Sequence, residues 1–182
     1  MKQITLLFLL LVESAIAQNS LFNQVEAKNI GPTIMSGRVV DLAVNPKNPT
    51  EFYVAYATGG LWYTNNNGTS FTPVMDSAET VNCGSVTVDW NSGTIWVGTG
   101  EVNASRSSYA GVGVLKSSDK GKTWENLGLK DSHHISRIWV NPSNLNEIVV
   151  ASVGHLYTTN KERGIYKSTD GGKSWKQTLF VA

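Results

Sequence analysis

The amino-acid sequence predicts an all-β fold built from three repeated units, each with four short antiparallel strands. Three observations lead to this prediction. Short runs rich in Val, Ile and Thr alternate with turn residues, and the 182 residues include 17 Gly. No window shows a sustained apolar period of 3.6 residues, which an amphipathic helix would need. One octet of residues also returns at intervals close to fifty residues, as expected of a chain with internal structural repeats.

The N-terminal residues have the pattern of a secretory signal peptide. Lys2 forms a short basic region, Ile4 to Val12 is apolar, and Ala15-Ile16-Ala17 fits a cleavage site with small residues. We therefore expect a signal peptide at 1–17 and a secreted, cell-surface or periplasmic protein. The alternative is a membrane anchor, but the apolar run is about half as long as a bilayer requires. We expect no membrane span after cleavage.

Four runs with strand character recur in each unit after a lead-in segment at 18–35. In the first unit, 39–46, 52–57 and 60–63 precede the octet, and a fourth run starts at its aromatic residue. The corresponding runs are 83–90, 95–99 and 114–116 in the second unit, and 135–142, 148–153 and 165–167 in the third. Four strands in about fifty residues are typical of β-propeller blades. We predict a partial β-propeller with blades at about 36–76, 80–128 and 133–182.

The octet itself explains why it recurs. It reads TNNNGTSF at 64–71, SSDKGKTW at 117–124 and STDGGKSW at 168–175. An Asp or Asn side chain accepts hydrogen bonds from the N–H groups of its own turn, and Gly adopts backbone angles that other residues resist. We predict a turn between the third and fourth strands of each blade, with structural residues Asn66, Gly68, Phe71, Asp119, Gly121, Trp124, Asp170, Gly172 and Trp175.

Two alternatives concern these repeats. Asp119 and Asp170 could form a pair of catalytic carboxylates, but equivalent turns of neighbouring blades are a blade width apart, farther than glycosidase carboxylates. Three blades are also fewer than the four to eight of a closed propeller. We expect the remaining blades in a longer chain; oligomerisation of three-blade chains is the alternative.

Composition and charge exclude some classes of function. The net charge is +1 and only 16% of residues are charged, so nucleic acid is not an expected partner, because phosphate binding needs clustered Lys and Arg. The single Cys83 stands in an apolar run and is expected to be a small buried residue rather than a catalytic thiol. No cofactor is predicted.

Loop lengths indicate which face of the blades could bind a ligand. Strands alternate in direction, so the loop entering the first strand and the loop joining the second and third strands share a face, opposite to the octet turns. The latter loop is long in the second and third units, and long loops on a rigid scaffold often carry binding residues. The candidate binding residues are Arg38, Asn82, Glu101, Arg106, Tyr109, His134 and His155. Ordinary solvated loops and a solvated channel mouth are the alternatives.

The three histidines invite a metal site. His133 and His134 are neighbours, and adjacent residues of a strand point to opposite sides, so they are poorly placed to ligate one ion. With His155 the only other histidine, we predict no metal site.

The octets resemble the Asp-box, or BNR repeat, with the pattern Ser-x-Asp-x-Gly-x-Thr-Trp. The copies at Asp119 and Asp170 match it and the copy at Asn66 is degenerate. Proteins with this repeat include sialidases, xyloglucanases, sortilin-type receptor domains and photosystem assembly factors. The segments IGPTIMSGRVVDLAVNP, GLKDSHHISRIWVNP and GHLYTTNKERGIYKSTDGGKSW resemble secreted bacterial proteins described as sortilin-N-terminal-like or BNR-like glycosyl hydrolases.

This resemblance implies a propeller but leaves two functions open. The first is a non-catalytic scaffold that binds a protein or a glycan, as a sortilin-like domain does. The second is part of a glycoside hydrolase whose catalytic residues lie largely outside this chain. Xyloglucanases carry a catalytic Asp before an x-Gly-Gly segment of their first blade, and Ala57 stands at that position here. No sialidase-type Phe-Arg-Ile-Pro segment is present, so we assign no catalytic residue.

Overall fold

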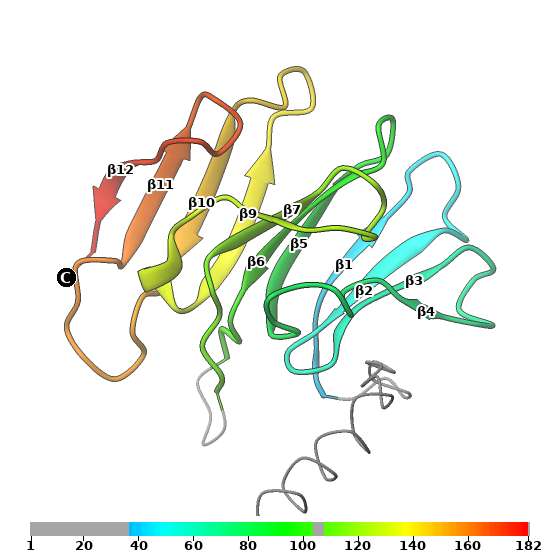
Figure 1. Cartoon of the computed structure of the whole chain (residues 1–182), viewed down its shortest axis with the longest axis horizontal. Coiled ribbons are helices and arrows are strands. Elements are labelled where there is room, and N and C mark those ends of the chain that lie inside the picture. Colours follow the sequence, from blue (N-terminus) through cyan, green and yellow to red (C-terminus); the bar gives the residue numbers. More distant parts are fainter. Residues whose placement is uncertain (1–36, 104–107, 182) are drawn as a thin grey trace, which may run out of the picture. The chain divides into compact units, whose positions relative to one another are not determined.

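The structure, a computed structural model, describes residues 37–103 and 108–181 (Figure 1). These residues belong to one compact unit, Gly31–Ala182. They form three four-stranded antiparallel sheets, which confirms the all-β prediction and its four-stranded repeat. The predicted signal peptide, the lead-in segment and Arg106 lie outside the described residues.

Each sheet follows the order of the chain, so every strand pairs with the next one along the sequence. A 3-10 helix, η1 (Lys130–Ser132), connects the second and third sheets. The strands of sheet 1 are β1 (Val39–Val44), β2 (Phe52–Tyr56), β3 (Gly60–Thr64) and β4 (Thr72–Pro73). Those of sheet 2 are β5 (Cys83–Asp89), β6 (Thr94–Thr99), β7 (Val114–Ser117) and β8 (Glu125–Asn126). Those of sheet 3 are β9 (Ile135–Val140), β10 (Ile148–Ser152), β11 (Gly164–Ser168) and β12 (Lys176–Phe180).

Sheet 2 is covered on both faces. All six residues of β6 are buried, which explains why this strand has no alternation of apolar and polar residues. Val86, Val97 and Leu115 pack in one core cluster with residues of sheet 1 such as Leu61. Trp96 and Val114 pack in a second cluster with Ile138, Ile148 and Val150 of sheet 3. Cys83 is fully buried, as predicted, and burial raises the pKa of its thiol to about 12.

The start of β9 lies very close to sheet 2. A Cβ atom at Gly98 would lie 2.4 Å from Cγ2 of Ile135, and one at Gly84 would lie 2.2 Å from its carbonyl oxygen. Both distances are below any normal contact, so glycine at these two positions is what allows sheet 3 to approach sheet 2.

The octets form the predicted turns between the third and fourth strands of their sheets. Asp119 Oδ1 accepts hydrogen bonds from Ser117 Oγ at 2.8 Å and from the Thr123 N–H at 2.9 Å, and Oδ2 accepts one from Thr123 Oγ1 at 2.7 Å. Asp170 makes the same bonds with Ser168 and Ser174. Gly121 and Gly172 have φ angles of 89° and 94°, which glycine adopts without strain.

The first octet achieves the same turn with Asn66. Its Oδ1 accepts from Thr64 Oγ1 and from the Ser70 N–H, and its Nδ2 donates to Ser70 Oγ at 2.8 Å. The fourth strand begins one residue later than predicted, after the aromatic residue of the octet. The aromatic residue makes its contacts outside the strand. Trp175 Nε1 donates to the Leu127 carbonyl at 2.7 Å, next to the last strand of the preceding sheet. Phe71 packs edge-on against Phe52 of its own sheet.

Candidate functional site

Arg38, Asn82 and His134 occupy equivalent positions in the three sheets. Each lies just before the first strand of its sheet. Each backbone carbonyl accepts a hydrogen bond from the residue that directly follows the second strand. The donors are the N–H groups of Ala57, Gly100 and Val153, at 2.8, 2.9 and 2.8 Å. The equivalence inferred from the repeat is therefore present in the backbone, and it places the three side chains on corresponding sites.

Glu101 joins this row from the loop after β6. Its side chain is fully buried, and Oε1 accepts hydrogen bonds from Arg38 Nε at 2.8 Å and from Arg38 Nη2. Oε2 is also buried, without a hydrogen-bond partner. Glu101 is therefore not a residue of a solvated loop with local ion pairs, because its cation comes from a position 63 residues away.

His134 is buried beside Glu101. Burial lowers the pKa of its imidazole, although the backbone carbonyl and carboxylate of Glu101 act in the opposite direction. Its Nδ1 is buried and has no hydrogen-bond partner. We name Arg38, Glu101 and His134 the Glu101 cluster.

Asn82 and Tyr109 fix the long loop next to this cluster. Asn82 Nδ2 donates to the Ala110 carbonyl at 3.1 Å, and the Glu101 N–H donates to the Tyr109 carbonyl at 3.0 Å. The Tyr109 side chain is 55% exposed. The structure thus holds the loop next to Glu101 through the side-chain amide of Asn82 and the backbone carbonyl of Tyr109, and it leaves the Tyr109 side chain exposed.

The expectation that His133 and His134 are neighbours on a strand is wrong. Both precede β9, and His133 has a left-handed backbone with φ of 54°. Its ring stacks on that of His155, with centroids 3.8 Å apart, and His155 Nε2 lies 3.2 Å from the Asp131 carbonyl oxygen. Across residues 37–103 and 108–181, no three His, Cys, Asp or Glu side chains gather closely enough to hold a metal ion.

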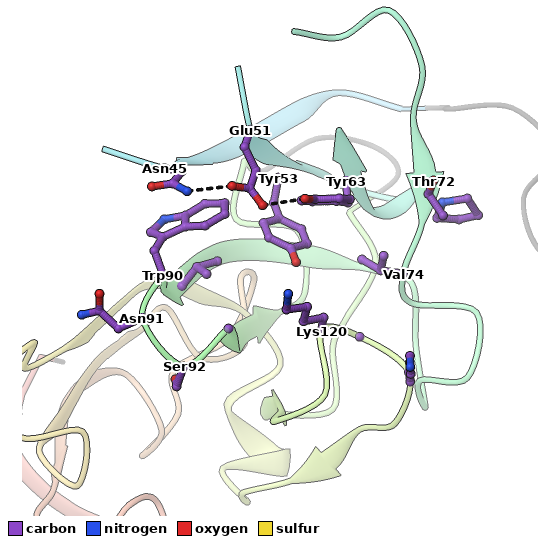
Figure 2. Close-up of a pocket in the computed structure, with 15 residues that line it drawn as sticks. Asn45, Glu51, Tyr53, Tyr63, Thr72, Val74, Trp90, Asn91, Ser92 and Lys120 are labelled. Carbon is purple, nitrogen blue, oxygen red and sulfur yellow. Dashed lines mark hydrogen bonds between the residues drawn. The ribbon is translucent and has the colours of Figure 1, made fainter. Parts of the chain in front are cut away.

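A groove on the other side of sheets 1 and 2 was not predicted from the sequence. It has a volume of about 830 Å³ and lies where the β1–β2 turn, the β5–β6 turn and the second octet meet (Figure 2). Tyr53, Tyr63 and Trp90 supply its aromatic surface, and the rings of Tyr53 and Trp90 are 5.5 Å apart. We name it the Tyr53–Trp90 groove. The available signal was Trp90, which stands where the other two units have Pro46 and Pro142.

One polar network of the groove belongs to the repeat. Glu51 accepts hydrogen bonds from Tyr63 Oη at 2.5 Å and from Asn45 Nδ2 at 2.7 Å, and these bonds lower the pKa of its carboxyl. In sheet 3, Glu147 accepts from Asn141 Nδ2 at the same distance and pairs with Lys167. The Asn–Glu pair is thus a structural element of the β1–β2 and β9–β10 turns.

No protein-family model and no curated protein match this chain. Several solved structures do. An ancestral GH74 enzyme is 23% identical, with a TM-score of 0.64, over 86% of this chain and 20% of its own. The GH74 xyloglucanase from Xanthomonas campestris is 18% identical, with a TM-score of 0.53, over 79% and 21%. YCF48 bound to D1 peptide is 15% identical, with a TM-score of 0.53, over 84% and 45%.

These similarities establish a partial β-propeller fold. The chain spans about a fifth of the length of the two GH74 chains and under half of the YCF48 chain.

Proposed function

We propose that this chain is part of a secreted β-propeller that acts as a non-catalytic, sortilin-like scaffold for binding a protein or a glycan. The observation that carries the proposal is the Glu101 cluster. A single buried carboxylate is held by Arg38, next to a buried imidazole, at positions supplied by all three sheets. Pre-positioned polar groups at the ends of rigid strands are typical of binding sites.

The residues of the cluster favour binding over hydrolysis. Glycoside hydrolases that use carboxylates generally need two of them, one as acid and one as base or nucleophile. Among the described side chains that bond to the cluster, Glu101 is the only carboxylate, and its charge is paired with Arg38. Ala57, the position of the xyloglucanase Asp, is buried and donates only its backbone N–H, to Arg38.

The test is a binding screen of the purified chain against a glycan array and a phage-displayed peptide library. We expect a ligand whose affinity falls at least fivefold in Tyr109→Ala, because this exposed side chain stands on the residue whose carbonyl accepts the Glu101 N–H, and its loss leaves the fold intact. Lys176→Ala, an exposed change on sheet 3, is the matched control. Equal binding by the Tyr109 variant would place the ligand elsewhere and contradict the proposal.

Part of a glycoside hydrolase is the second candidate function, and the similarity to two GH74 enzymes favours it. Turnover of xyloglucan and of sialosides tests whether this chain carries catalytic residues of its own. We expect none from this chain. Hydrolysis that Glu101→Gln abolishes, with an unchanged melting temperature, would establish the enzyme instead.

Export forms a separate part of the proposal, based on the basic, apolar and small-residue pattern of residues 1–17. The described residues include no helix that could serve as a membrane span. Expression of the full chain in a bacterium with a Sec pathway, followed by intact mass measurement of the exported protein, tests it. We expect a mature chain that starts at Gln18; a cytoplasmic product with the full-length mass would contradict the assignment.

A further inference from the structure

The Tyr53–Trp90 groove has unused hydrogen-bond donors at its surface. Figure 2 shows the Tyr53 hydroxyl and the Lys120 side chain directed into the same space, with hydrogen bonds drawn only to Glu51. Within the described part of the chain, Tyr53 Oη, Trp90 Nε1 and Lys120 Nζ have no hydrogen-bond partner. Both Glu51 oxygens, in contrast, already accept hydrogen bonds. The groove therefore offers donors and calls for a ligand with acceptors.

The charges of the groove point to an anion. Its lining residues include two lysines, Lys120 and Lys122, and one carboxylate, Glu51, which Tyr63 and Asn45 stabilise. Neither lysine forms a salt bridge with a described carboxylate, although the charge of Lys120 contributes to the lowered pKa of Glu51. An ammonium group that forms no salt bridge at the edge of a groove is suited to a charge-assisted hydrogen bond with a carboxylate of a ligand.

The aromatic side chains add a second requirement. Tyr53 is only 3% exposed, and Trp90 and Tyr63 are half-buried, so their rings form a rigid apolar wall with polar edges. Such amphipathic rings suit a ligand that has an apolar face and a polar rim. A bare phosphate or an acidic peptide side chain would satisfy the lysines and leave this wall uncovered.

Sugar rings that carry carboxylates meet both requirements. Their C–H face can cover the aromatic wall, their hydroxyl oxygens can accept from Trp90 and Tyr53, and their carboxylates can pair with Lys120 and Lys122. The volume of about 830 Å³ falls within the usual range of ligand pockets. We propose that the Tyr53–Trp90 groove is a binding site for an acidic, uronate-type oligosaccharide, separate from the Glu101 cluster.

Equivalent positions in the second and first octets supply a conservative variant. Lys120 has a φ angle of 63°, and Asn67 holds the same position in the first octet with a φ angle of 57°. Asn is one of the residues that accept left-handed backbone angles. Lys120→Asn therefore removes the charge without straining the turn. Lys173→Asn, in the exposed part of the third octet and away from the groove, is the matched control.

The experiment is calorimetric titration of the full chain with hexagalacturonate, with cellohexaose as the neutral probe and hexaglutamate as the acidic peptide probe. We expect binding of hexagalacturonate alone, weakened about tenfold by Lys120→Asn and by Trp90→Leu, and unchanged by Lys173→Asn. Glu101→Gln should also leave it unchanged, which separates this site from the proposed function of the Glu101 cluster.

Three results would overturn the proposal. The first is no heat of binding with hexagalacturonate at millimolar concentration. The second is equal affinity for hexaglutamate, which would show that charge alone is recognised. The third is unaltered binding by Lys120→Asn. We expect this variant to fold, because the side chain is exposed and its turn is preserved, and circular dichroism checks that it does.

Discussion

The indole Nε1 of Trp124 donates a hydrogen bond of 3.0 Å to the backbone carbonyl of Val74, 50 residues earlier in the chain and in the preceding sheet. Trp175 makes the same bond to Leu127. Each octet therefore closes its own turn through short-range bonds and also fastens its sheet to the one before.

Trp124→Phe tests this connection between sheets. Phe keeps most of the ring but has no N–H group, so the Val74 carbonyl loses its donor. We expect the free energy of unfolding to fall by about 1–2 kcal/mol, measured by urea denaturation. Trp139→Phe is the control, because that ring is 51% exposed. An equal loss in both variants would mean that ring size, not the hydrogen bond, is responsible.

Asp119 should make stability depend on acid pH. Its hydrogen bonds with Thr123 and Ser117 lower the pKa of its carboxyl to about 2, below its ordinary value of 3.8. A carboxyl with a lowered pKa stabilises the fold above its unfolded value and loses that contribution as pH falls towards the folded value. We expect this loss between about pH 4 and pH 2, with a smaller slope in Asp119→Asn. At pH 7, Asp119→Asn should be more stable than Asp119→Ala, because the amide of Asn66 closes the first octet by accepting from the Ser70 N–H and donating to Ser70 Oγ. Urea midpoints measured between pH 7 and pH 2 check both expectations. Equal slopes for the unchanged chain and Asp119→Asn would contradict the first. Equal midpoints for Asp119→Asn and Asp119→Ala at pH 7 would contradict the second.

His134 should act in the range just below neutrality. Burial lowers the pKa of its imidazole below the ordinary value of 6.5, so the folded chain holds this ring neutral while the unfolded chain binds a proton. The stability it supports is complete above pH 6.5 and decreases as pH falls through that value towards the folded pKa. We expect His134→Gln to flatten this decrease in thermal melts between pH 7.5 and 5. A slope that His134→Gln leaves unchanged would assign the effect to other groups.

Asp41 connects all three sheets. Its Oδ2 accepts hydrogen bonds from Ser85 Oγ at 2.9 Å and from the Val86 N–H at 3.0 Å, and it pairs with Arg137 Nη1 at 3.3 Å. These residues belong to β1, β5 and β9. Asp41→Ala leaves the Val86 N–H without its acceptor, so we expect a loss of about 2–3 kcal/mol.

A double-mutant cycle with Arg137→Ala separates the contributions. Arg137 is 70% exposed at its side chain, so its pairing should contribute less than about 1 kcal/mol. A coupling energy that accounts for most of the Asp41→Ala effect would show instead that the exposed ion pair dominates.

The sequence by itself determined the units that close over short distances. In the octets, Asp119 and Asp170 bond to residues no more than four positions away, so the residue types alone specify the turn. Each strand also pairs with the next one along the chain, and the repeat placed Arg38, Asn82 and His134 in equivalent positions.

Only the tertiary structure decided which side chains from different sheets meet. Arg38 and Glu101 are 63 residues apart, and the groove joins Tyr53 of sheet 1 to Trp90 and Lys120 of sheet 2. These meetings depend on how closely the sheets pack, which glycines such as Gly98 and the core residues between the sheets set together. The distance between two sheets is a property of many packed side chains at once, so no single segment of the sequence encodes it.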